Sequence, residues 1–99
     1  MKINHNDIMI IEHAKRILNI YDTKENLIYS LYDGKISDFI SELPDYFARC
    51  HQSFVVNMNY IKSIQKSEII LNNGREIPVS FRYGKTVHDN YMEFLKNII

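Results

Sequence analysis

Cys50 and His51 stand side by side in the stretch FARCHQSFVVN, residues 47–57, among aromatic and β-branched residues typical of a strand. A thiol next to an imidazole suggests a nucleophile and its base. Adjacent residues of a strand point to opposite faces, however, so these two side chains cannot serve each other. The sequence places none of the other three histidines near this cysteine. The commonest role of a lone cysteine, a small buried apolar residue, is the better explanation.

Metal-binding and cofactor-binding patterns are missing from the sequence. Its four histidines and one cysteine show none of the spacings C-x₂-C, H-x₃-H or H-E-x-x-H. The carboxylates Glu42 and Asp45 flank the end of a predicted helix and are better explained as solvated charges. No glycine-rich loop is present to cradle a phosphate. We therefore expect no enzyme, no metal and no cofactor.

Gln52 is the odd member of the strand predicted over residues 47–56. Alternation places it on the same face as Ala48, Cys50 and Val56, which are apolar or small. If strand pairing ends near Cys50, Gln52 is released for contacts outside the protein. The alternative is that His51 and Gln52 only cap backbone groups at a break in the strand.

A second polar segment, SFRYGK at residues 80–85, follows the last predicted strand, where a loop is expected. It places Arg82 and Lys85 around the aromatic residues Phe81 and Tyr83. Basic side chains interleaved with aromatics on a loop suit contacts with phosphates and base edges. The alternative is a solvated turn whose two aromatic rings are anchored in the core.

Composition describes an ordinary soluble domain, with 45% hydrophobic and 24% charged residues among 99. We expect one domain over residues 1–99, without a membrane span or a signal peptide. A single cysteine fits a reducing cytoplasm. The net charge is zero, yet residues 49–85 carry six Lys/Arg against two Asp/Glu, whereas residues 1–48 carry five against eight. Such a distribution can steer a polyanion to one face of a neutral molecule.

The elements that must position these side chains are short. Apolar and alternating runs predict strands, and the i, i+3, i+4, i+7 spacing of Ile36, Phe39, Ile40 and Leu43 predicts a helix that Pro44 closes. Strands are expected over residues 7–11, 16–21, 26–32, 47–56, 68–71 and 76–80, and a C-terminal helix over 86–98. Asn73-Gly74 marks a hairpin turn, and Pro78 predicts an edge strand. The fold class is therefore mostly β (α+β), with two helices.

Taken together, the two polar segments resemble the LytTR DNA-binding domain, the output module of LytR/AlgR/accessory-gene-regulator-type bacterial response regulators. The resemblance rests on FARCHQSFVVNMNYIKSI followed by LNNGREIPVSFR, and the upstream stretch NDIMIIE is similar to the family's Asp-Ile strand. The matching positions of the two segments are Phe47, Arg49, His51, Ser53, Phe54, Val55, Val56, Asn57, Ile61, Gly74, Val79, Ser80 and Arg82.

The resemblance implies short-stranded antiparallel sheets with a short internal helix and a C-terminal helix. It also implies a cytoplasmic transcription regulator of a two-component system, whose loops enter successive major grooves of duplex DNA and bend it. Implied partners are double-stranded DNA with paired direct repeats, a receiver domain in the full-length protein and a second copy on DNA. The base-reading residues would be Gln52, Arg82, His51 and Arg16, and the phosphate-contacting residues Lys15, Arg49, Lys85, Tyr83 and His13. Some relatives carry a cysteine where Cys50 stands, which implies a redox-sensitive grip on DNA as a minor hypothesis.

Two other functions stay open at this point. A protein-interaction module or antagonist of the same fold that no longer binds DNA would explain the zero net charge. A cysteine-dependent enzyme is the third hypothesis. Steep salt dependence of binding would favour DNA, whereas a mostly apolar protein interface would respond little to salt.

Overall fold

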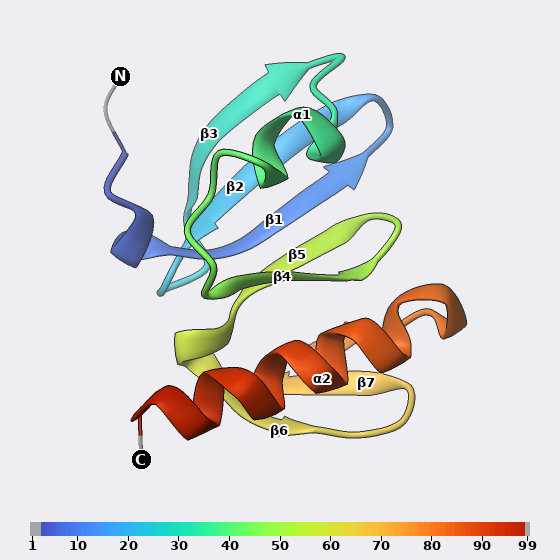
Figure 1. Cartoon of the computed structure of the whole chain (residues 1–99). Helices are drawn as coiled ribbons and strands as arrows, with labels where there is room; N and C mark the ends of the chain where they lie inside the picture. Colours follow the sequence, from blue (N-terminus) through green and yellow to red (C-terminus); the bar gives the residue numbers. More distant parts are fainter. Residues whose placement is uncertain (1–2, 99) are drawn as a thin grey trace.

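Two antiparallel sheets and a long C-terminal helix make up the fold, seen here in a computed structural model that describes residues 3–98 (Figure 1). The first sheet has five strands in the order β3-β2-β1-β5-β4, and the second has three in the order β6-β7-β8. The strands are β1 (Ile8–Ala14), β2 (Ile17–Asp22), β3 (Leu27–Tyr32), β4 (Phe47–His51), β5 (Phe54–Asn57), β6 (Ile61–Ile64), β7 (Glu68–Leu71) and β8 (Glu76–Pro78). The helices are α1 (Ile36–Ile40), α2 (Phe81–Ile98) and the 3₁₀ turns η1 (His5–Asp7) and η2 (Met58–Tyr60). The predicted mostly β class is confirmed.

Strand β1 lies at the centre of the five-stranded sheet and is covered on both faces. Its first four residues are all buried, and a bulge at Ile8/Ile10 changes the alternation of their side chains. Met9 and Ile10 consequently join one core cluster, while Ile8 and Ile11 join the other.

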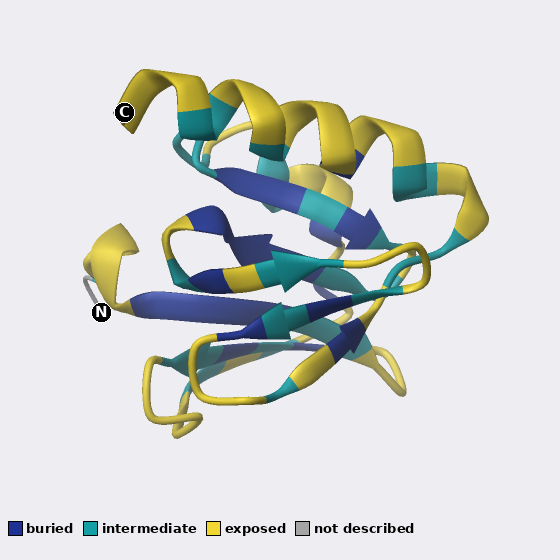
Figure 2. Ribbon diagram, turned by 90° about the horizontal axis from the view of Figure 1, so that it is seen from below, coloured by how far each residue is buried: buried dark blue, intermediate teal, exposed yellow. Residues whose placement is uncertain are grey.

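The two core clusters lie on opposite faces of the five-stranded sheet, since strand neighbours such as Val55 and Val56 belong to different clusters. One cluster joins the sheet to α1 through residues such as Leu18, Ile36 and Val55. The other joins it to the three-stranded sheet and α2, and it includes Ile69, Leu71, Ile77 and Val87. Helix α2 shows its exposed side to solvent along its whole length in Figure 2. Within the described residues, no helix combines the length and apolar character needed to cross a membrane.

The single strand predicted over residues 47–56 is in fact a hairpin, β4 and β5, with Gln52 and Ser53 at its turn. The prediction was wrong because the turn contains no Gly, Pro or Asn, and both arms have high β propensity. The side chain of His51 replaces that signal, since its Nδ1 accepts a hydrogen bond from the Ser53 N–H at 3.0 Å.

Most of the segment 80–85, predicted as a loop, forms the first part of α2, which begins at Phe81 rather than at residue 86. The prediction was wrong because Gly84 lies in this segment and glycine disfavours helix interiors. The apolar stripe nevertheless extends back one turn, because half-buried Tyr83 precedes buried Val87 by four residues. Ile98, predicted to lie on the stripe, is 63% exposed.

Smaller differences concern the ends of elements. Helix α1 ends at Ile40, before the predicted Leu43, although Leu43 still packs against the core. The turn at Gly74, with φ of 90°, and the edge position of β8 with Pro78 are as predicted. Arg16 was expected to begin a strand, but it and Lys15 both have positive φ and form the tight turn between β1 and β2.

Candidate nucleic-acid interface

Four segments converge on the end of the molecule that is remote from both termini (Figure 1). They are the β1–β2 turn, the β4–β5 turn, the β6–β7 turn and the first turn of α2, and we call this end the loop edge. Its basic side chains come from distant parts of the sequence: Lys15, Arg16, Lys66, Arg82 and Lys85. The fold therefore gathers on one surface the charges that the sequence only suggested.

Two backbone hydrogen bonds hold the β4–β5 turn between its neighbours. The His13 N–H donates to the Ser53 carbonyl at 2.9 Å, which ties the turn to the end of β1. The Ser80 N–H donates to the Cys50 carbonyl at 3.0 Å, which ties β4 to the start of α2. The relative positions of these segments are consequently fixed by the backbone rather than by mobile side chains.

The side chain of Arg49 holds the same turn through hydrogen bonds to its backbone. Its Nη2 donates to the Gln52 carbonyl at 2.7 Å and its Nε to the His51 carbonyl at 3.3 Å. Its guanidinium also lies over the Tyr83 ring of α2, 5.1 Å from the ring centre, which is a cation–π contact. Arg49 thus joins the hairpin to the helix.

His51 and Gln52 present polar groups at the tip of the turn. The bond that His51 Nδ1 accepts from the Ser53 N–H places the proton of a neutral imidazole on Nε2, which is then a donor. Gln52 is exposed, and its amide offers both a donor and an acceptor. These are the groups that read base edges in a groove.

Arg82 is exposed, and its guanidinium lies 5.5 Å from the centre of the Tyr83 ring. Within residues 3–98 it forms no ion pair, so its charge is available to an external anion. Lys85, by contrast, donates to Asp89 at 2.9 Å. This hydrogen bond and the charge of Asp89 raise the pKa of Lys85, while the pKa of Asp89 falls for the same reasons.

Arg16 is also engaged with a carboxylate. Its Nε and Nη2 donate to the two oxygens of Asp33 at 3.0 and 3.3 Å, and its guanidinium lies 5.4 Å from the Tyr32 ring centre. The pair is open to solvent, with 70% of the Arg16 side chain exposed. Its neighbour Lys15 is exposed on the same turn.

Comparison with known proteins decides the family. The family model described as the LytTr DNA-binding domain matches residues 1–92. The chain belongs to the LytTr DNA-binding domain family. Its function is therefore DNA binding in transcription regulation, and it is not an enzyme. A solved LytTr DNA-binding domain from Bacillus cereus superposes with a TM-score of 0.80 at 26% identity, over 91% of this chain and 85% of that one.

Two regulators show the similarity in sequence. The chain is 36% identical to transcriptional regulatory protein YpdB of Escherichia coli (strain K12) over 61 residues, which are 61% of the chain and 24% of YpdB. It is 35% identical to accessory gene regulator protein A of Staphylococcus aureus (strain N315) over 69 residues, which are 70% of the chain and 28% of that protein. This LytTr domain thus spans about a quarter of the length of these curated relatives.

A shallow hollow of about 200 Å³ brings three of the predicted residues of this LytTr domain together. His13, Arg49 and Gln52 line it, although they come from three different segments. Lys35, at the N-terminal end of α1, lines the same hollow and was not predicted as a site residue. The only sequence feature that marks Lys35 is its position just after the Asp33-Gly34 turn. The fold places this turn beside the β4–β5 turn, so that Lys35 and Gln52 line the same hollow.

Cys50 occupies the core side of the hairpin in the LytTr domain. It is fully buried, and burial raises the pKa of its thiol to about 12. Reactive cysteines are partly exposed and have a lowered pKa, so this thiol has the opposite environment. Residues 3–98 hold no group of three or more His, Cys, Asp or Glu side chains placed to bind a metal.

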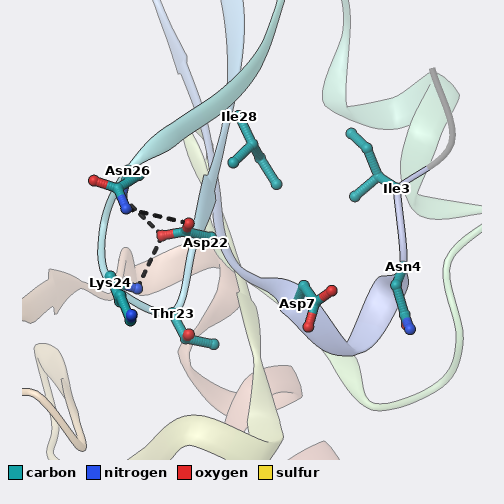
Figure 3. A pocket seen from close by; sticks show the side chains of 8 residues that line it. All are labelled: Ile3, Asn4, Asp7, Asp22, Thr23, Lys24, Asn26 and Ile28. Carbon is teal, nitrogen blue, oxygen red and sulfur yellow. Dashed lines mark hydrogen bonds between the residues drawn. The ribbon is translucent and has the colours of Figure 1, made fainter.

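The opposite end of the LytTr domain is unsuited to phosphates. A hollow of about 550 Å³ beside η1 and the β2–β3 turn is lined by two carboxylates, Asp7 and Asp22, and by one lysine, Lys24 (Figure 3). Hydrogen bonds from the backbone of Asn26 and of Lys24 lower the pKa of Asp22, so it is ionised at neutral pH. Negative charge at this end favours approach of DNA at the loop edge instead.

Proposed function

We propose that residues 1–99 form a single sequence-specific DNA-binding domain, the output domain of a bacterial response regulator. The observation that carries this proposal is the convergence of the β1–β2 turn, the β4–β5 turn and the start of α2 on one basic edge (Figure 1). Projecting turns that are held rigidly by a sheet can enter a groove without a recognition helix. The loop edge would then insert its segments into successive major grooves, which requires the DNA to bend.

Within this proposal the base-reading residues are Gln52, Arg82, His51 and Arg16. Arg82 can donate twice to guanine O6 and N7, and Gln52 can pair with adenine N6 and N7. Each such pair contributes about 1–3 kcal/mol of discrimination against the wrong base. Lys15, Lys85, Tyr83, His13 and Arg49 are the proposed phosphate-contacting residues, which would set register and salt dependence.

The relatives supply the wider setting of the proposal. They are regulators about four times as long as the matched segment, so we infer that a receiver domain accompanies this chain in its full-length protein. We also propose that two copies occupy paired direct repeats as a homodimer on DNA. A regulator of this kind works on the chromosome, and we therefore propose a cytoplasmic location.

Selection of bound duplexes from a random DNA pool tests the proposal directly. We expect enrichment of one motif, with binding that weakens steeply between 50 and 200 mM salt, by roughly 10³-fold or more for six phosphate contacts. Arg82→Ala should abolish the preference for the selected motif while leaving unfolding cooperative. Lys96→Ala, at the other end of α2, is the matched control and should bind as the parent does. Absence of enrichment, or selectivity that survives Arg82→Ala, would refute the proposed function.

A further inference from the structure

Phe81, the first residue of α2, stands apart among the large apolar residues. Its exposure is 104%, whereas Tyr32 reaches 66% and Ile98 63%. A value above 100% means that the side chain makes almost no contact with the rest of the protein. One exposed apolar residue is ordinary by itself, so its surroundings decide what it does.

The position of Phe81 is fixed by the backbone on both sides. The preceding Ser80 N–H donates to the Cys50 carbonyl at 3.0 Å, and the following residue is Arg82. Successive residues of a helix point about 100° apart, so the side chains of Phe81 and Arg82 leave the first turn of α2 from adjacent positions. These positions lie at the loop edge, next to the β4–β5 turn.

Phe81 shares its surroundings with two lysines. A hollow of about 900 Å³ between α2 and the β6–β7 turn is lined by Phe81, Lys66 and Lys85, and also by apolar side chains such as Ile64 and Val79. A purely apolar protein partner would bury these charges at a cost. A polyanion that also presents apolar groups matches both features, and the major groove of DNA is such a surface, because each thymine displays a 5-methyl group there.

We propose that Phe81 packs against the 5-methyl group of a thymine next to the base pair that Arg82 reads. The inference rests on the proposed function, since it assumes that the loop edge enters the major groove. Phe81 would thereby be a specificity-determining residue in its own right, adding an apolar reading position to the hydrogen-bonding ones. It would also explain why a large apolar side chain is kept fully exposed at this edge.

Replacement of single thymines by deoxyuridine in the selected duplex tests this contact, because the exchange removes only the methyl group. At one thymine beside the guanine assigned to Arg82, we expect the parent protein to lose about fourfold in affinity, the value of one buried methyl-sized group. Phe81→Ala should lose affinity for the thymine duplex and show no further loss with deoxyuridine. Met92→Ala, which removes another exposed apolar side chain from α2, should behave as the parent does.

The outcomes separate this inference from the proposed function. If the parent selects no motif at all, the proposed function fails before Phe81 is tested. If the parent is selective but the methyl effect is as large in Phe81→Ala as in the parent, the contact does not exist. If the parent binds every deoxyuridine duplex as tightly as the thymine duplex while Phe81→Ala binds both more weakly, Phe81 acts without the methyl group, as a wedge between bases would, and the proposed contact is overturned.

Discussion

The guanidinium of Arg49 and the ring of Tyr83 lie 5.1 Å apart and join the β4–β5 hairpin to the first turn of α2. Arg49 simultaneously donates to the two carbonyls of the turn, those of His51 and Gln52. Three contacts are thus made by one planar, permanently charged group. We infer that Arg49 acts chiefly by holding the turn, even though its charge also adds to the loop edge.

Arg49→Lys distinguishes holding the turn from contacting phosphate. Lysine keeps the charge but cannot form the forked contacts or the same stacking, so we expect affinity for the selected duplex to fall roughly tenfold. The slope of log K against log salt should stay nearly unchanged, as measured by fluorescence anisotropy at several salt concentrations. Lys15→Ala is the comparison, because loss of a phosphate contact should reduce that slope by about one. Affinity retained by Arg49→Lys would contradict the positioning role, because a phosphate contact needs only the positive charge that lysine keeps.

Asp33 competes with DNA for Arg16. The two side chains form a bidentate pair at 3.0 and 3.3 Å on the exposed surface. Asp33→Asn should therefore release Arg16 and raise affinity for the duplex about three- to tenfold at low salt, with little effect above 0.5 M. Asparagine tolerates the φ of 58° at this position, so the fold should be unaffected.

Asp45→Asn is the matched control for this change of charge, because Asp45 lies exposed near the opposite end of β4. It should alter affinity less than Asp33→Asn does. Filter binding or anisotropy at 50 mM salt measures both variants. Weaker binding by Asp33→Asn would show instead that the ion pair holds Arg16 in its reading position.

Much of this fold could be predicted from the sequence, because its elements are carried by local patterns. Alternation at residues 26–32 and the Asn-Gly turn before Arg75 each needed only neighbouring residues. The β4–β5 turn could not be predicted in this way. It depends on the His51 side chain replacing the usual turn residues, and on Arg49 reaching two carbonyls.

The candidate site shows the same division. The residue types of Gln52 and Arg82 indicated contact with bases, but their convergence depends on long-range pairing of Ser80 with Cys50. The ion pair between Arg16 and Asp33 could not be predicted either, because the two residues are seventeen positions apart in the sequence. The full exposure of Phe81 could not be predicted from the sequence. Gly84 disfavours a helix, so the segment was predicted as a loop and the direction of the Phe81 side chain was not defined.

Asn57, the last residue of the FARCHQSFVVN stretch, has a structural role. It is fully buried, its Nδ2 donates to the Ile8 carbonyl at 2.9 Å, and its Oδ1 accepts from the Asn59 N–H at 3.0 Å. Asn57→Ala leaves both backbone groups without their partner, so we expect a loss of about 2–4 kcal/mol in the free energy of unfolding. Urea denaturation measures it. Asn73→Ala, which removes a similar but exposed bond to the Arg75 N–H, should cost less than about 1 kcal/mol, and equal losses would contradict the buried role.

Cys50 is expected to make the free energy of unfolding fall as the pH rises through the alkaline range. Burial raises the pKa of its thiol to about 12 in the folded protein, whereas an unfolded thiol ionises near pH 8.5–9. Between these values the folded state keeps a proton that the unfolded state loses, so the free energy of unfolding falls as pH rises. The largest slope expected is about 1.4 kcal/mol per pH unit.

Comparison of the parent with Cys50→Ala isolates this effect. Tyr21, whose pKa is raised by burial and by the charge of Glu12, contributes in the same direction to both proteins and cancels in the difference. Urea unfolding from pH 8 to 11 should therefore show the parent losing stability more steeply than the variant above pH 9. At pH 8 the folded thiol should also resist iodoacetamide, while the urea-unfolded thiol reacts. Parallel pH curves, or rapid modification of the folded protein, would show that Cys50 is accessible and would revive the redox-sensitive grip on DNA.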